Sequence, residues 1–126
     1  MSVLTVTQDS YQEVTSLPGI VFLDCWAPWC PPCRAFKPIF EAAAEANPDI
    51  TFGLVNTEQE TELAAQLGIT TIPTVMAFRD SLLVFAQPGA FTAQEFAHLI
   101  DSVRGLDMDK VRAESEPNPE DSAPLP

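Results

Sequence analysis

Two cysteines separated by two prolines form the stretch of this sequence with the clearest capacity for chemistry. Cys30 and Cys33 lie between an apolar run, residues 20–23, and a segment with helical spacing. The pair is therefore predicted at a strand-to-helix junction, with Cys30 at the helix start and Cys33 one turn in. The unpaired N–H groups of a first helical turn favour an anion. We expect Cys30 to lose its proton more readily than a free cysteine.

This spacing leaves three chemistries to compare. A structural zinc site needs four ligands, and beyond the pair only Cys25 and His98 remain, without the paired spacing of a second ligand group. No metal is therefore expected. A structural disulfide is disfavoured because such bridges are rare in chains without an export signal, and the first residues lack the basic and long apolar regions of one. These residues favour redox chemistry.

The elements that must position the pair alternate between strands and helices. Strands are predicted over residues 4–6, 20–23, 50–56, 74–78 and 82–86. Helices are predicted up to residue 15, from residue 30 to about 47, from residue 57 or 58 to 67, and after Thr92 up to Gly105. The last two strands form a hairpin. The pattern predicts an α/β fold, a central mixed β-sheet flanked by helices on both faces.

Length and composition limit the other possibilities. The 126 residues suit one domain, predicted over residues 1–105, followed over residues 106–126 by a short helical extension and a disordered acidic, proline-rich tail from residue 113. A formal charge of −12 argues against nucleic acid or an anionic membrane as partner, and no apolar run reaches membrane-spanning length. The three cysteines leave one unpaired.

Several separated segments resemble the thioredoxin family. Asp24 and residues 26–33, Trp-Ala-Pro-Trp-Cys-Pro-Pro-Cys, look like its active-site segment; residues 72–74, Ile-Pro-Thr, look like its cis-proline loop, and Gly89 follows the last strand. The resemblance covers roughly residues 3–103 and implies the thioredoxin fold. The sequence departs from the usual form at Pro31, where the family has glycine, and at Cys25, where it has phenylalanine.

The cysteine pair is expected to act as a redox-active disulfide. Cys30, expected near the surface between Trp29 and Pro31, attacks a target disulfide, and Cys33 resolves the mixed disulfide. Asp24 follows an apolar run, so desolvation should raise its pKa; the resemblance implies that it exchanges protons with Cys33. Family members often carry a lysine that modulates this aspartate, and Leu54 stands at that position.

Substrate binding is assigned to a shallow apolar groove around Cys30. Its predicted residues are Trp29, Pro31, Pro32, Ile72, Pro73, Gly89 and Ala90. The resemblance implies that the bond before Pro73 is cis, which frees the Ile72 backbone to pair with an extended substrate. Trp26 is interpreted as a core aromatic. Cys25 is interpreted as a buried small hydrophobe, with a regulatory thiol as the alternative.

These expectations combine into a cytoplasmic, monomeric protein-disulfide reductase with no bound cofactor. Its partners would be disulfide-containing proteins and a thioredoxin reductase-like flavoenzyme that draws electrons from NADPH. One alternative is a thioredoxin-fold chaperone or interaction module, and another is a disulfide oxidase or isomerase.

Pro31 and Pro32 remove two backbone N–H groups next to Cys30. A less stabilised thiolate would make the chain a stronger reductant, unless the stiffer loop compensates.

Overall fold

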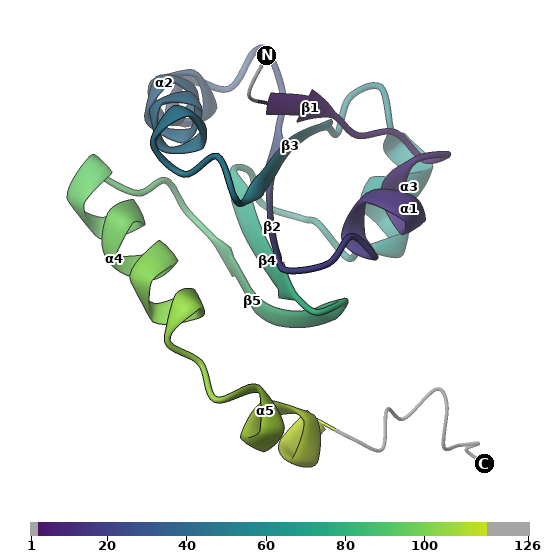
Figure 1. The fold of residues 1–126 in the computed structure, drawn as a ribbon. Coiled ribbons are helices and arrows are strands. Elements are labelled where there is room, and N and C mark those ends of the chain that lie inside the picture. The colour runs from purple at the N-terminus through teal and green to yellow at the C-terminus, as the bar shows by residue number, and fades with distance from the viewer. Residues whose placement is uncertain (1–2, 116–126) are drawn as a thin grey trace.

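The structure is a computed structural model that describes residues 3–115 (Figure 1). In chain order its elements are β1 (Val3–Thr5), α1 (Tyr11–Thr15), β2 (Ile20–Trp26), α2 (Pro31–Ala46), β3 (Thr51–Asn56), α3 (Thr61–Gln66), β4 (Thr74–Arg79), β5 (Leu82–Pro88), α4 (Ala93–Arg104) and α5 (Met108–Ser115).

The strands form one mixed sheet in the order β1-β3-β2-β4-β5. β1 and β2 run parallel to β3, whereas β4 runs antiparallel to both β2 and β5. β2 therefore lies in the middle, which explains its continuous apolar run: both of its faces are covered. Its register places Leu54 of β3 and Val75 of β4 on either side of Asp24.

Helices cover both faces of the sheet, as predicted, with α2 and α4 on one face and α1 and α3 on the other (Figure 1). Alternate residues of β2 point to opposite faces. Phe22 packs in the core on the α2 and α4 face, with Phe36 and Phe96 among its partners. Leu23 and Cys25 pack in the second core, under α1 and α3.

The predicted hairpin and the last main helix have the expected ends. Asp80 and Ser81 both have positive φ angles, 54° and 72°, as the tight turn between β4 and β5 requires. Thr92 caps α4, and its side chain and that of Glu95 accept hydrogen bonds from each other's backbone N–H groups.

The helix predicted from residue 57 or 58 starts later than expected. The Asn56 side chain accepts the Glu58 N–H at 2.9 Å in a turn, and α3 begins at Thr61.

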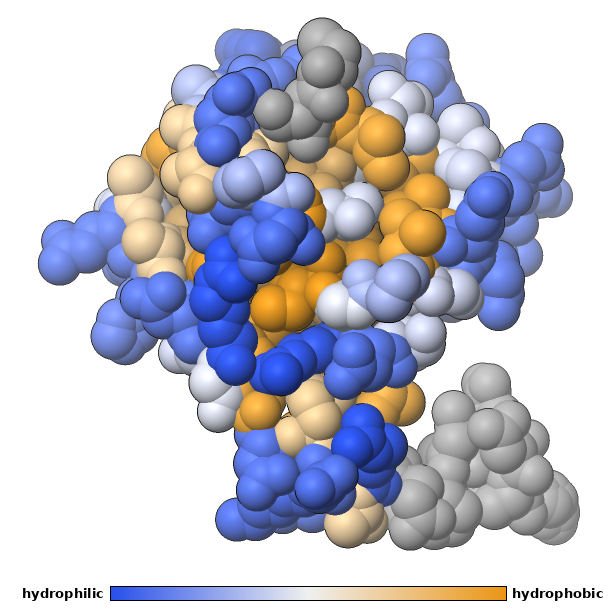
Figure 2. Space-filling view, viewed as in Figure 1, coloured by the Kyte–Doolittle hydropathy of each residue, from blue (hydrophilic) through white to orange (hydrophobic). Residues whose placement is uncertain are grey.

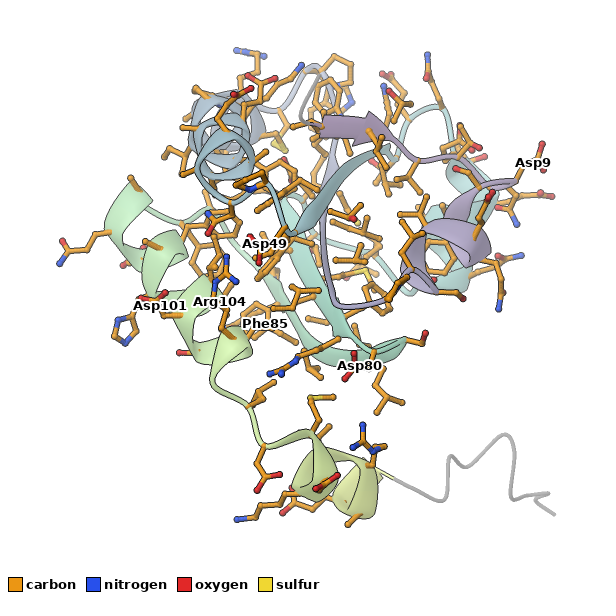
Figure 3. All side chains as sticks on the ribbon, viewed as in Figure 1. Asp9, Asp49, Asp80, Phe85, Asp101 and Arg104 are labelled. Carbon is orange, nitrogen blue, oxygen red and sulfur yellow. A yellow bond between two sulfur atoms is a disulfide. The ribbon has the colours of Figure 1, made fainter. Side chains whose placement is uncertain are left out.

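The last helices are tied to the rest of the domain by arginines. Arg104 of α4 donates to Asp49 at 2.7 and 3.1 Å, and the two side chains point toward each other in Figure 3. Arg79 of β4 donates to the Val103, Arg104 and Leu106 carbonyls at 2.9–3.1 Å. Figure 2 shows the face of the molecule on which α4 and the mostly hydrophilic α5 lie.

The C-terminal prediction needs one correction. α5 continues to Ser115, so residues 113–115, predicted as the start of the disordered tail, are helical. Met108 is buried, which anchors the beginning of this helix. The rest of the predicted tail, residues 116–126, lies outside the described residues, and the domain boundary at residue 105 stays a prediction.

Candidate active site

The cysteine pair lies at the junction of β2 and α2, where its sequence favours a helix start. Pro31 and Pro32 occupy the first two helical positions, whose N–H groups would have no partner within the helix. Cys30 is the N-cap residue, and its Sγ accepts the Cys33 N–H at 3.2 Å. Cys30 and Cys33 are joined as a disulfide. The arrangement places Cys30 sulfur at the positive end of the helix, as predicted.

The two sulfurs are less exposed than their neighbours suggested. Cys33 is fully buried and Cys30 keeps 3% of its surface exposed, although Trp29 is 62% exposed. The prediction that Trp29 and Pro31 leave Cys30 near the surface is therefore wrong for the Cys30 side chain itself. An incoming sulfur has access to the pair only at the narrow exposed edge of Cys30.

The loop before β4 approaches Cys30 from the other side. The Ile72–Pro73 peptide bond is cis, as the resemblance implied, and the Ile72 carbonyl oxygen lies 3.9 Å from Cys30 Sγ. Gly89, at the end of β5, donates its N–H to the Pro73 carbonyl at 2.7 Å. Its φ of 120° is a conformation that favours glycine. The structure thus joins Ile72, Pro73 and Gly89 beside Cys30, with Ala90 exposed next in the chain.

Asp24 lies on the same face of β2 as Phe22, below α2, and is completely buried. Neither carboxylate oxygen has a hydrogen-bond partner among residues 3–115. Burial raises the pKa of Asp24 to about 7, and the positive charge of Lys37 opposes part of that rise. The carboxyl group therefore exchanges its proton near neutral pH, as expected from the sequence.

The contact of Lys37 with Trp26 is a feature of the site that was not predicted from the sequence. The Lys37 Nζ lies 4.7 Å from the ring centroid of Trp26, within cation–π range. Trp26 is partly exposed and not a core aromatic, although its Nε1 is buried and has no partner in the described part of the chain. The helical spacing could have indicated the position of Lys37: it follows Cys33 by four residues and so lies on the same side of α2.

Cys25 points away from this cluster, into the core under α1 and α3. Burial, and then the charge of Asp24, raise the pKa of its thiol to about 12. The thiol is protonated at neutral pH, which agrees with its interpretation as a buried hydrophobe. Arg34, in the first turn of α2, donates to the Pro28 carbonyl at 3.0 Å and so stabilises the loop before Cys30.

Within residues 3–115, no group of three or more histidine, cysteine or acidic side chains is placed to hold a metal ion. In the same range no helix has the length and apolar character needed to cross a membrane.

Comparison with known proteins identifies the family. The family model named Thioredoxin matches residues 2–102. The chain belongs to the thioredoxin family. A Streptomyces coelicolor protein named "Putative thioredoxin 2" is 45% identical over 111 residues, which cover 88% of this chain and 83% of that protein. "Thioredoxin 1" of Synechococcus elongatus is 36% identical over 104 residues, covering 80% and 97% of the two chains. A mutant thioredoxin from Halobacterium salinarum has the same fold, with a TM-score of 0.76 and 30% identity over 82% of this chain and 92% of its own.

Membership in the thioredoxin family gives the cysteine pair its chemistry. The chain is a thiol–disulfide oxidoreductase, a protein-disulfide reductase whose redox group is the Cys30–Cys33 pair. Thioredoxins act on disulfide substrates and exchange electrons through their own cysteines.

Proposed function

We propose that Cys30 is the attacking sulfur and Cys33 the resolving sulfur in the reduction of protein disulfides. The observation that carries this proposal is the difference in exposure, since only Cys30 of the pair retains any accessible surface. Its position as the N-cap of α2, where it accepts the Cys33 N–H, supports the same assignment because both features stabilise a thiolate.

The reaction proceeds in two exchanges. The Cys30 thiolate attacks one sulfur of the target disulfide; a mixed disulfide forms, and the second target sulfur leaves as a thiolate and takes a proton. The Cys33 thiol then gives its proton to the Asp24 carboxylate and attacks Cys30. The Cys30–Cys33 disulfide forms, the remaining target sulfur leaves, and the target has gained the two electrons that the pair has lost.

Asp24 is the proposed proton acceptor of the second exchange and the donor of the reverse reaction. Its pKa of about 7 suits both directions near neutral pH. Both carboxylate oxygens lack a partner among residues 3–115, so no hydrogen bond to the described protein competes for the proton.

The proposed substrate groove surrounds the exposed edge of Cys30. Trp29, Pro31 and Pro32 supply exposed apolar surface on one side, and Ile72 and Pro73, together with Gly89 and Ala90, form the other side. An extended segment of the target would pair with the Ile72 backbone, which holds its disulfide at Cys30. Because this pairing uses the backbone of the target, the groove would bind targets with varied side chains.

The proposed cellular setting is a monomer in the cytoplasm that a thioredoxin reductase-like flavoenzyme re-reduces with electrons from NADPH. Because each turnover leaves Cys30 and Cys33 as a disulfide, an external electron donor must restore the two thiols. Reduction of insulin disulfides in the presence of thioredoxin reductase and NADPH tests the cycle. A chaperone or interaction module would not turn over, and an oxidase or isomerase would favour the reverse direction.

The assignment of the two sulfurs is tested by trapping. Cys33→Ser should accumulate a stable mixed disulfide with a target protein, because the first exchange occurs and the second cannot. Cys30→Ser should accumulate none. Non-reducing gels and mass spectrometry after mixing each variant with oxidised target give the result, and a trapped complex with Cys30→Ser instead would reverse the assignment.

A further inference from the structure

We propose that this reductase holds its targets at a second point, a pocket beside the Ile72–Pro73 loop that binds an apolar side chain of the target a few residues from its cysteine. This inference rests on the proposed substrate groove and adds to it a preference for particular targets. The pocket lies between the loop after α3 and the strands β4 and β5, and it is called the β5 pocket below.

The β5 pocket is a small apolar cavity of about 230 Å³. Its walls include Leu67, Ile69, Met76 and Leu83. Met76 is buried in the core under α1 and α3, and Leu67 and Ile69 pack against that core, so the floor of the pocket is fixed by the fold. None of the described residues that line the pocket is charged. The pocket therefore suits an uncharged, apolar side chain.

The pocket is open because the helices on this face of the sheet end short of β5. α1 has five residues and α3 has six, and the core beneath them extends to Met76 and Phe78 of β4. β5 is the next strand and the last of the sheet. Ala86 pairs with Met76, and Leu83 pairs with Phe78, so both lie on the α1 and α3 face. Leu83 is 51% exposed there, and an exposed apolar side chain that lines a cavity is typical of a binding surface.

The β5 pocket and the proposed groove share the Ile72–Pro73 loop. Thr71 and Thr74 flank this dipeptide in the sequence, and both line the pocket. Pro88, which pairs with Thr74 in the sheet, also lines it. On the other side of the loop, the Ile72 carbonyl oxygen lies 3.9 Å from Cys30 Sγ. One short loop therefore separates the reacting sulfur from the pocket.

A target held at Cys30 reaches the pocket within a few residues. An extended segment advances about 3.3 Å per residue. A segment that pairs with the Ile72 backbone passes Thr71 next, so a side chain two or three residues from the target cysteine would enter the pocket. The segment passes Thr71 in a single direction, so only one side of the target cysteine is placed in this way. The pocket would thus favour targets with an apolar residue at that position.

The test measures the reduction of short peptide disulfides by the reduced full chain in single turnovers. The probes are symmetric disulfide dimers of seven-residue peptides of glycine and serine with a central cysteine, and a leucine is placed at each other position in turn. At one position, on one side of the cysteine, leucine should lower the half-saturating peptide concentration about tenfold, because the side chain is buried in the pocket. The limiting rate should stay close to that of the leucine-free peptide, because the contact is the same in the bound and transition states. A series in which no position has this effect, or in which both sides have it equally, overturns the inference.

Two variants and a matched control assign the effect to the pocket. Leu83→Ser removes an apolar wall and Ala86→Phe fills the space; each should raise the half-saturating concentration of the preferred leucine peptide about fivefold. Both positions are exposed, so either variant gives the answer should the other fold poorly. Leu4→Ser is the control, since Leu4 is 43% exposed on β1, at the opposite edge of the same sheet. An equal rise in Leu4→Ser, or no rise in either pocket variant, overturns the inference.

Direct binding separates this inference from the proposed reaction. If no peptide is reduced, the proposed function fails, and the pocket is still tested by NMR of methyl-labelled protein with millimolar leucine peptides that carry serine in place of cysteine. We expect shifts of the Ile69, Met76 and Leu83 methyl groups, and their absence overturns the inference. A dimer of the chain that dissociates in Leu83→Ser, without an effect of the peptides, would assign this surface to a second copy and would also overturn it.

Discussion

Asp24 binds a proton over a pH range in which the unfolded chain has already released it. Its pKa is about 7 in the folded protein, against 3.8 without burial. Its contribution to stability is therefore fully present below about pH 4 and is lost as the pH rises through 7, a loss of roughly 4 kcal/mol. A buried carboxylate that has no hydrogen-bond partner among residues 3–115 destabilises the fold when it is ionised.

Asp24→Asn should remove this pH dependence. An amide does not titrate, so the free energy of unfolding of the variant should fall by several kcal/mol less than that of wild type between pH 4 and pH 8. Urea unfolding at these pH values measures the difference. Asp49→Asn is the control, because Arg104 lowers the pKa of Asp49, whose contribution is lost only as the pH falls below the usual range of a carboxyl group. A parallel decline in Asp24→Asn and wild type would contradict the prediction.

Helix α2 determines the electrostatics of Cys30 through its first residues. With Pro31 and Pro32 at the first two helical positions, the Cys33 N–H is the backbone donor that reaches Cys30 Sγ. Pro31→Gly restores one N–H group at the helix start, which should stabilise the Cys30 thiolate and make the reduced form more favourable.

The prediction is that Pro31→Gly is the more oxidising protein. Equilibration of each protein with mixtures of reduced and oxidised glutathione gives the potentials, and alkylation rates against pH give the Cys30 pKa, which should fall in the variant. A wild type more oxidising than Pro31→Gly would mean that loop stiffness outweighs the missing donor.

The elements whose formation depends on a local hydrophobic pattern were predictable from the sequence. β2 and the stripe of α2 that begins at Cys33 were expected from hydrophobic periodicity, and the cysteine junction with them. The start of α3 was misplaced because a side-chain hydrogen bond of Asn56 competes with the helix. The burial of Cys30 and the contact of Lys37 with Trp26 were missed because they depend on how distant segments pack.

At the scale of the whole molecule, Arg79 connects the sheet to the end of α4. One guanidinium nitrogen donates to the Val103 and Arg104 carbonyls at the C-terminus of that helix and to the Leu106 carbonyl just beyond it. Arg79→Met should lower the free energy of unfolding by about 2 kcal/mol, since hydrogen bonds from a charged group are lost.

Because Arg79 lies at the opposite end of β4 from Thr74 and the Ile72–Pro73 loop, the rate of insulin reduction by Arg79→Met should remain that of wild type while the protein is folded. Arg112→Met is the control for charge, since Arg112 pairs with exposed acids of the same region, and should change stability little. A loss of stability in Arg112→Met equal to that in Arg79→Met would assign the effect to net charge.

The alternation of side chains along β2 also separates Cys25 from the other two cysteines of the molecule. Cys25 is enclosed on the α1 and α3 side, whereas Cys33 and the helix that carries it cover the other side, with the sheet between them. A native chain therefore cannot shuffle its bridge among three cysteines. A disulfide to Cys25 would have to form before β2 is incorporated into the sheet. The folded sheet therefore restricts repeated oxidation and reduction to the Cys30–Cys33 pair.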